Sequence, residues 1–155
     1  MDRNRTAVVL LAEDNPAEQR LAERALGQGV IECDLRIVSD GEEALHYLRR
    51  QGAYAEANTA PTPDLVLLDL NMPKIDGRQV LEEMRSDPQL KSIPVVILTT
   101  SKAERDVLES YRLGCNSFLN KPVAVAEFVD LLQSLGQYWL KLVVLPSRTS
   151  GASSK

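Results

Sequence analysis

The chain has little of the chemistry that builds disulfide scaffolds or structural zinc sites. Its 155 residues include two cysteines, Cys33 and Cys115, and a single histidine, His46. The cysteines lie far apart in the sequence and belong to no cluster of Cys and His residues. Small secreted domains are normally dense in cysteine, and structural zinc is held by groups of Cys and His ligands. We therefore expect both cysteines to be packing residues of a protein in a reducing compartment.

The chain also lacks an excess of basic charge and a long apolar run. Its formal net charge is −4, which argues against nucleic acid or an anionic membrane surface as the main partner. The first apolar run, residues 7–12, is too short for the core of a signal peptide or for a membrane span. We therefore expect a cytoplasmic protein with neither nucleic acid nor membrane as a partner.

Length and composition predict a single globular unit. A chain of 155 residues that is 44% hydrophobic and 26% charged can bury the core of one domain and is short for two. Residues 51–63 contain few large apolar groups and are expected to form an exposed loop, and the Ser-rich residues 147–155 are expected to form a disordered tail. The domain is then residues 1–146, with a core of about 7–135 and an apolar extension of about 136–146.

Hydrophobic periodicity predicts an alternation of strands and helices. The expected strands are residues 7–12, 35–38, 64–69, 94–99 and 117–120. The expected helices are residues 16–26, 41–50, 77–85, 102–113 and 125 to at least 138. Strands and helices that alternate over this length are typical of the α/β class, with a doubly wound parallel sheet and helices on both faces.

One acidic residue occupies an informative place in the expected sheet. Asp69 ends the apolar run of residues 65–68, and a continuous apolar run is typical of a strand that is buried on both faces. In open parallel α/β sheets, ligands bind beyond the carboxyl ends of the strands, so Asp69 lies at the edge where chemistry takes place. An Asp that merely capped the following turn would have the same neighbours in sequence, so this segment alone leaves both interpretations open.

Other polar residues follow the ends of neighbouring strands. Glu13 and Asp14 follow the first strand, Thr99 ends the fourth, and Lys121 follows the fifth. The carboxyl ends of parallel strands meet at one edge, so we expect these residues to converge on Asp69. Three crowded carboxylates repel one another, and a cation among them would favour their ionised forms. Mg²⁺ takes oxygen ligands and binds beside phosphoryl groups, so it fits this set of donors.

The same residues suit the transfer of a phosphoryl group. Lys121 offers a positive charge, and the hydroxyl of Thr99 can donate to a phosphoryl oxygen. Asp69 projects from the central strand, and a carboxylate can act as a nucleophile that forms an aspartyl phosphate. The sequence therefore leads to the hypothesis that Asp69 accepts a phosphoryl group.

These residues, in this order, resemble the receiver domain of two-component response regulators. The resemblance spans residues 7 to about 135. It is carried by Glu13, Asp14, the segment of residues 64–73, Gly77, Thr99, Lys121 and Pro122. The fold that it implies is a flavodoxin-like, five-stranded parallel sheet with strand order 2-1-3-4-5.

The resemblance implies a phosphoacceptor and a metal site at the acidic edge. Asp69 would accept the phosphoryl group. Mg²⁺ or Mn²⁺ would be held by Asp14 and Asp69, by Glu13 through a water, and by Asn71 through its backbone carbonyl. Phosphotransfer and autodephosphorylation would be self-catalysed, so the resemblance implies a phosphoacceptor rather than an enzyme that acts on a separate substrate.

The resemblance also implies a set of switch residues. Thr99 and Lys121 would bind the phosphoryl group, and Phe118 would be the aromatic residue that responds to it. The peptide bond that precedes Pro122 would be cis, an arrangement that is essentially confined to proline. Phosphorylation would then shift the elements around the last two strands.

The implied partner is a sensor histidine kinase. The loop at residues 51–63 and the apolar residues 138–146 look like those of the small single-domain regulators of bacterial and cyanobacterial phytochrome kinases. Exposed apolar segments mark interfaces, so we expect a homodimer through the last helix and this segment. The expected contacts are Tyr138, Trp139, Leu142 and Val143. The alternative is that the segment folds back onto its own domain.

Other classes of protein agree less well with the sequence. A haloacid-dehalogenase-like phosphatase would carry a second Asp two residues after its nucleophile, where this chain has Asn71. After Pro146 only a short polar tail follows, which leaves no room for a DNA-binding helix-turn-helix. A pseudo-receiver that only binds partners would not need the phosphoacceptor, metal and phosphoryl-binding residues together. We therefore expect a single-domain response regulator, with the non-phosphorylated interaction module as the alternative.

Overall fold

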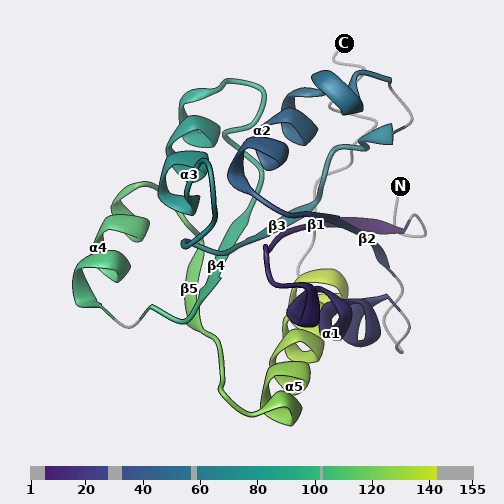
Figure 1. Ribbon diagram of the computed structural model, residues 1–155, viewed down its shortest axis with the longest axis vertical. Helices are drawn as coiled ribbons and strands as arrows, with labels where there is room; N and C mark the ends of the chain where they lie inside the picture. The colour runs from purple at the N-terminus through teal and green to yellow at the C-terminus, as the bar shows by residue number, and fades with distance from the viewer. Residues whose placement is uncertain (1–5, 28–32, 57–58, 102, 143–155) are drawn as a thin grey trace.

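A parallel sheet with strand order β2-β1-β3-β4-β5 runs through the centre of the molecule (Figure 1). The computed structural model describes residues 6–27, 33–56, 59–101 and 103–142. The strands are β1 (Ala7–Ala12), β2 (Cys33–Val38), β3 (Leu65–Leu68), β4 (Val95–Thr99) and β5 (Ser117–Asn120). All four neighbouring pairs are parallel, which confirms the predicted class and strand order.

Helices connect the strands and cover both faces of the sheet. Within the described residues they are α1 (Pro16–Leu26), α2 (Gly41–Arg49), α3 (Gly77–Ser86), α4 (Glu104–Arg112) and α5 (Val125–Gly136). Helices α1 and α5 lie together on one face, whereas α2, α3 and α4 cover the other (Figure 1). Among the described helices, none combines the length and apolar character that a membrane crossing requires.

The central strands contribute alternate residues to two separate cores. Leu10 and Ala12 of β1 pack in the layer of α2 and α3, whereas Val9 and Leu11 pack in the layer of α1 and α5. The strands β3 and β4 alternate in the same way. Because both faces of these strands are covered, they appear in the sequence as continuous apolar runs. Polar residues therefore emerge only where the strands end.

Side-chain caps fix the start of the helices that border this edge. Asn15 precedes α1, and its Oδ1 accepts hydrogen bonds from the backbone N–H groups of Ala17 (2.8 Å) and Glu18 (3.2 Å). Asp40 and Asp76 cap α2 and α3 in the same manner. Such caps satisfy backbone donors that have no partner within the helix. They therefore determine where each helix begins relative to the strand before it.

The segment at residues 51–63, expected to be an exposed loop, is partly tied down. The hydroxyl of Tyr47 donates to the carbonyl of Pro61 (2.8 Å), and Arg50 Nε donates to the carbonyl of Ala60 (2.9 Å). Ala60 is buried, and the segment also contains the short 3₁₀-helix η1 (Gly52–Tyr54). Most of its described residues are nevertheless exposed, as expected, and only Ala60 and Pro63 are buried.

The last helix continues into a π-helical turn, η3 (Gln137–Leu142). The ring of Trp139 is half-buried against the core between the sheet and helices α1 and α5, whereas Tyr138 is 56% exposed. Trp139 therefore contacts its own domain, as in the fold-back alternative. Val143 and the expected tail at residues 147–155 lie outside the described residues.

Candidate functional site

The ends of β1 and β3 bring three carboxylates together. The N–H of Glu13 donates to the carbonyl of Val38 (3.0 Å), and the N–H of Asp69 donates to that of Ala12 (3.2 Å), so both residues extend the sheet. One carboxylate oxygen each from Glu13, Asp14 and Asp69 lies within 4.8 Å of the others. Glu13 and Asp69 are 3% and 7% exposed, and Asp14 is open to solvent. We call these three residues the acidic cluster.

The ammonium group of Lys121 lies among these carboxylates. Its Nζ is 2.5 Å from Glu13 Oε1, 2.6 Å from Glu18 Oε1 and 3.1 Å from Asp69 Oδ2. The N–H of Lys121 donates to the carbonyl of Thr99 (2.8 Å), which continues the pairing of β4 with β5. Burial disfavours the ammonium, but the hydrogen bonds to Glu13 and Glu18 and the charge of Asp69 outweigh this effect and raise the pKa of Lys121. The side chain is therefore positively charged at neutral pH.

Burial has the opposite consequence for Glu13. It raises the pKa of that carboxyl from its ordinary value to about 7, although Lys121 and the N–H of Asn15 (2.9 Å) both lower it. The charge of Asp69 raises the pKa further. The site thus holds more negative charge than one ammonium can balance, and a cation bound beside Glu13 would favour its ionised form.

The donor set fits a divalent cation. Hard cations such as Mg²⁺ and Mn²⁺ prefer oxygen ligands, and Mg²⁺ usually combines one or two carboxylates with water. Asp14 faces solvent and so leaves room for water on that side. The N–H of Asn71 donates to Asp69 Oδ1 (3.3 Å), so the loop after β3 turns back over the phosphoacceptor candidate. On this chemistry the acidic cluster can hold the metal.

Gly77, at the start of α3, packs against the backbone that carries Asp69. Its N–H donates to the carbonyl of Leu70 (2.8 Å). A Cβ atom at this position would lie 2.2 Å from the carbonyl oxygen of Asp69 and 2.8 Å from the Cα of Leu70. Only glycine allows so close an approach of two backbone segments. The glycine named in the sequence motif therefore has a steric reason.

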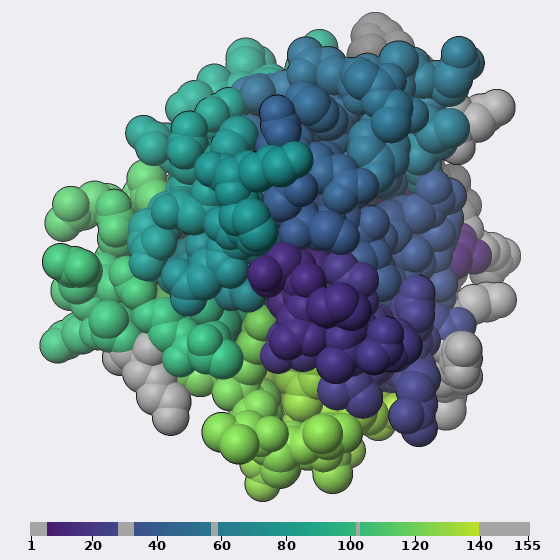
Figure 2. Space-filling model, viewed as in Figure 1, coloured from purple at the N-terminus to yellow at the C-terminus, as the bar shows by residue number. Residues whose placement is uncertain are grey.

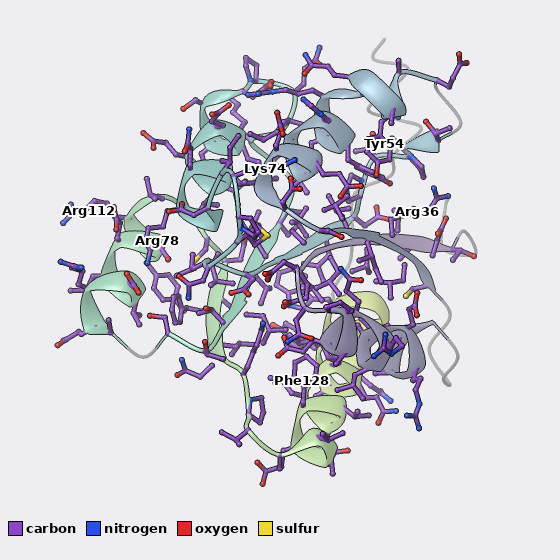
Figure 3. The ribbon with its side chains drawn as sticks, in the orientation of Figure 1. Arg36, Tyr54, Lys74, Arg78, Arg112 and Phe128 are labelled. Carbon is purple, nitrogen blue, oxygen red and sulfur yellow. The ribbon has the colours of Figure 1, made fainter. Side chains whose placement is uncertain are left out.

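Thr99 ends β4 at the same edge and is completely buried. Its Oγ1 accepts a hydrogen bond from the N–H of Ser101 (3.3 Å). The hydroxyl of Ser101 donates to the carboxylate of Asp106 in α4, which also accepts from Arg78 Nη2 (2.6 Å). Asn120 Nδ2 donates to the carbonyl of Ser101 (2.6 Å). These contacts connect α3, the loop after β4, α4 and β5, and Arg78 reaches from α3 toward α4 (Figure 3).

The structure corrects one prediction at this edge. No peptide bond among the described residues is cis, so the bond that precedes Pro122 is trans. For a bond to proline the trans form is favoured by about 0.5–1 kcal/mol. Lys121 reaches the acidic cluster with the trans bond, so its position does not require the cis form. Phe118 is half-buried and packs against the core on the side of α2 and α3.

Glu18 is the member of the site that the sequence analysis missed. It lies in the first turn of α1, and its contact with Lys121 joins residues 103 positions apart. Acidic residues are common in the first turn of helices because they complement the helix dipole. An acidic residue at that position therefore carries no specific signal. Only the fold shows that this turn faces the end of β5.

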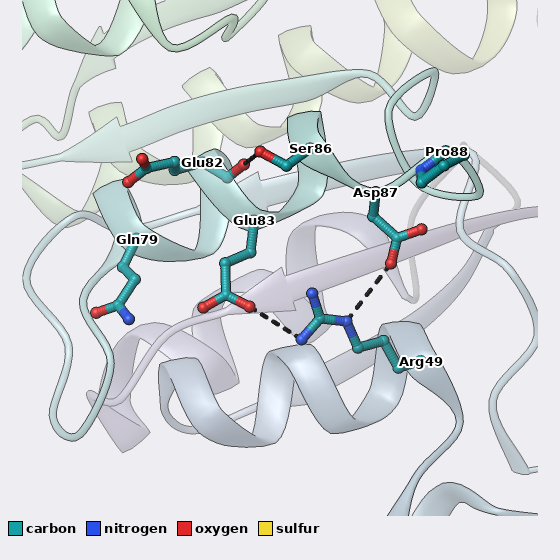
Figure 4. A pocket seen from close by; sticks show the side chains of 7 residues that line it. All are labelled: Arg49, Gln79, Glu82, Glu83, Ser86, Asp87 and Pro88. Atoms are coloured by element: carbon teal, nitrogen blue, oxygen red, sulfur yellow. Dashed lines mark hydrogen bonds and ion pairs between the residues drawn. The ribbon is translucent and has the colours of Figure 1, made fainter.

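A second polar surface lies between α2 and α3. Arg49 Nη1 is 2.9 Å from Glu83 Oε1, and Arg49 Nε is 3.5 Å from Asp87 Oδ2 (Figure 4). The groove is lined by Arg49, Gln79, Glu82, Glu83, Ser86, Asp87 and Pro88. None of these residues belongs to the acidic cluster, and the ion pairs of Arg49 join the two helices. We interpret this groove as part of the packing between the helices.

The space-filling view shows how segments distant in sequence meet at the surface. The purple N-terminal segment lies between the teal middle of the chain and the yellow-green C-terminal part (Figure 2). This arrangement agrees with contacts of Lys121 to Glu13 and Asp69. The site is therefore assembled from the two halves of the chain.

Comparisons with known proteins agree with this fold. A family model described as the response regulator receiver domain matches residues 9–133. The response regulator Rcp1 of Synechocystis sp. is 42% identical over 146 residues, which cover 94% of this chain and 97% of Rcp1. The Mn²⁺-bound structure of Rcp1 is 43% identical with a TM-score of 0.84, covering 91% of this chain and 99% of that chain. The phosphorylated cyanobacterial phytochrome response regulator RcpA is 43% identical with a TM-score of 0.86, covering 92% and 99%.

Proposed function

Because this chain belongs to the family of response regulator receiver domains, we propose that it is a single-domain regulator that accepts a phosphoryl group on Asp69 from a histidine kinase. The observation that carries the proposal is the contact of 3.1 Å between Lys121 Nζ and Asp69 Oδ2 of the acidic cluster. A carboxylate beside an ammonium and a metal-binding cluster is suited to attack a phosphorus atom. RcpA, the relative described as phosphorylated, supports the same reaction.

Asp69 is the nucleophile in the proposed reaction. One of its carboxylate oxygens forms a bond to phosphorus while the bond from phosphorus to the kinase histidine breaks, and the electron pair of that bond returns to the imidazole. Lys121 lies beside Asp69 and offsets the charge of the phosphoryl oxygens. Thr99 turns its hydroxyl toward the group and donates a hydrogen bond. Water later hydrolyses the acyl phosphate and restores the Asp69 carboxylate.

We assign the metal of this site to Mg²⁺ or Mn²⁺. Asp14 and Asp69 would bind it directly, with Glu13 through a water and Asn71 through its backbone carbonyl. When bound, the cation supplies positive charge that stabilises the negative phosphoryl oxygens. The acidic cluster supports this assignment through its three oxygen donors, and the Mn²⁺-bound form of Rcp1 is a relative with a metal of the same class.

The switch begins at Thr99. In the described state its oxygen accepts a hydrogen bond from the N–H of Ser101. Turning toward a phosphoryl group changes that contact, and Ser101 is tied through Asp106 to α4. Phe118 lies in β5 next to these elements and can follow the change. Local electrostatics at Asp69 would thus bias the positions of α4 and β5.

The proposed partner is a histidine kinase of the phytochrome type. RcpA is described as a phytochrome response regulator, and this relationship supports the assignment. We also propose a cytoplasmic homodimer whose contacts involve α5 and η3, with Leu142 and Val143 near the contact. Tyr138, which is exposed, serves as the anchor, whereas Trp139 faces its own domain. Neither nucleic acid nor a membrane is part of the proposed assembly.

The proposal is tested by labelling with phosphate. The protein is incubated with Mg²⁺ and ³²P-labelled acetyl phosphate, or with a phosphorylated histidine kinase, and the acyl phosphate is measured after gel filtration. We expect labelled wild type and no label in Asp69→Asn. Glu23→Gln, which removes a charge from the exposed surface of α1, is the control and should label like wild type. An unlabelled wild type would favour the non-phosphorylated interaction module.

A further inference from the structure

Glu18 gives Lys121 a carboxylate partner outside the acidic cluster. Its Oε1 lies 2.6 Å from Lys121 Nζ, which is closer than the 3.1 Å between Nζ and the phosphoacceptor Asp69. The side chain of Glu18 is 27% exposed, whereas that of Lys121 is 6% exposed. The ammonium that faces the phosphoacceptor is therefore shared with an acid from a different element.

The backbone of α1 holds Glu18 at this place. Asn15 caps the helix and accepts a hydrogen bond from the N–H of Glu18 (3.2 Å). Pro16 occupies the first helical position, where its fixed backbone angle suits a helix start. The cap and the proline thus fix the first turn of α1, from which Glu18 reaches Lys121.

Glu18 and a phosphoryl group require the same positive charge. A phosphoryl group on Asp69 brings additional negative charge to the site, and Lys121 is the side chain placed to neutralise it. Glu18 attracts the same ammonium, and its own charge repels the incoming group. Both effects act in one direction, because each makes the phosphorylated state less favourable.

We propose that Glu18 is a positioning residue that draws Lys121 toward α1 and weakens the affinity of the Asp69 site for a phosphoryl group. The proposal rests on the proposed function of Asp69 and adds to it a residue that sets the balance between the two states. Removal of the Glu18 charge should therefore strengthen binding of a phosphoryl mimic. A merely structural role would predict weaker binding or none, so the direction of the effect separates the two interpretations.

The experiment compares wild type with Glu18→Gln by titration with beryllofluoride in the presence of Mg²⁺. Bound beryllofluoride is detected by fluorine NMR, which does not depend on downstream signalling. The substitution keeps the size of the side chain and removes its charge. We expect the dissociation constant to fall by about three- to tenfold at low salt, and the difference to shrink at high salt because Glu18 is partly exposed.

Two further variants serve as controls. Glu23→Gln removes a charge from the exposed surface of the same helix and should leave the dissociation constant unchanged. Glu18→Asp keeps the charge and should stay within about twofold of wild type, on the scale of a weak exposed ion pair. Equal affinities of wild type and Glu18→Gln, or an equal gain in Glu23→Gln, would overturn the role of Glu18. Absence of any bound signal in wild type would instead reject the proposed function, and this inference with it.

Discussion

At the scale of single residues, Gly77 sets the position of the strand end that carries Asp69. A methyl group there would overlap the carbonyl of Asp69 at 2.2 Å, and the nearest atoms all belong to the backbone of Asp69 and Leu70, so no flexible side chain can move aside. We expect Gly77→Ala to lower the free energy of unfolding by about 1–3 kcal/mol, as overpacking does, and to slow phosphorylation because Asp69 shifts. Urea denaturation and acyl-phosphate labelling measure the two effects.

Ser86→Ala is the matched control for that variant. Ser86 lies at the other end of α3, and its exposed hydroxyl donates only to the carbonyl of Glu82 (3.0 Å). Surface substitutions of this kind change the free energy of unfolding by no more than about 0.5 kcal/mol. Wild-type stability and labelling in Gly77→Ala would show that the close approach is not needed.

The residues of the site could be predicted to the extent that they end strands. Asp69, Glu13 and Lys121 were expected to converge because a parallel sheet gathers the carboxyl ends of its strands, and the structure brings their side chains into contact. Glu18 could not be predicted, because its partner is chosen by the packing of α1 against the sheet. The cis form of the bond before Pro122 was predicted from the resemblance alone, and this prediction was wrong. No local sequence feature determines that isomer.

At the scale of elements, Asp106 joins α4 to α3 and to the loop after β4. Hydrogen bonds from Ser101 and from Arg78 lower the pKa of its carboxyl below the ordinary value. A carboxylate with a lowered pKa stabilises the fold above its unfolded pKa of about 3.9, and this stabilisation is lost as the pH falls through the folded pKa.

We therefore expect Asp106→Asn to lower the free energy of unfolding by about 1–3 kcal/mol at pH 7, because charge-assisted hydrogen bonds are lost. The difference from wild type should narrow as the pH falls from about 4 through the lowered pKa of folded Asp106, because wild type then loses this charge as well. Urea denaturation between pH 7 and pH 3 measures this gap. Glu109→Gln, an exposed neighbour of Arg78, is the control and should change little. A gap that is constant with pH would contradict the role of the charge.

The elements themselves were predictable because burial leaves a periodic pattern. The apolar runs of β1 and β4 and the helical spacing of α3 reflect the two cores that the sheet separates. The segment at residues 51–63 is mostly exposed, as expected, but the contacts that hold its last part could not be predicted, because they come from Tyr47 and Arg50, 10 to 14 positions earlier in the chain. Periodicity within a segment reports its own burial and contains no information about such partners.

At the scale of the whole molecule, the site contacts both helical layers. Glu18 of α1 touches Lys121 on one face of the sheet, whereas Thr99 is linked through Ser101 and Asp106 to α4 on the other. A change of charge at Asp69 acts on both connections at once. In the proposed mechanism, regulation and output are then separate functions, in which α1 would set how readily the phosphoryl group is held and α4 would respond to it.

The two neighbouring aromatic residues of η3 allow packing within the domain to be distinguished from the proposed dimer contact. Their rings are in edge contact with centroids 5.8 Å apart, yet Trp139 packs on its own core and Tyr138 is exposed. Trp139→Ala should lower the free energy of unfolding by about 2 kcal/mol, less than the 3–5 kcal/mol typical of a fully buried Trp. Urea denaturation at low protein concentration separates this effect from association.

Tyr138→Ala should change self-association rather than the free energy of unfolding. Its stability should stay within about 0.5 kcal/mol of wild type, because an exposed ring buries little surface. If Tyr138 anchors the proposed dimer, its removal should weaken self-association by about tenfold, the scale of an interface hot spot, as measured by sedimentation equilibrium. The opposite result would be unchanged self-association in Tyr138→Ala and weakened self-association in Trp139→Ala, with the free energy of unfolding of Trp139→Ala equal to that of wild type. That result would assign the dimer contact to Trp139, whose ring would then have to leave the core on assembly.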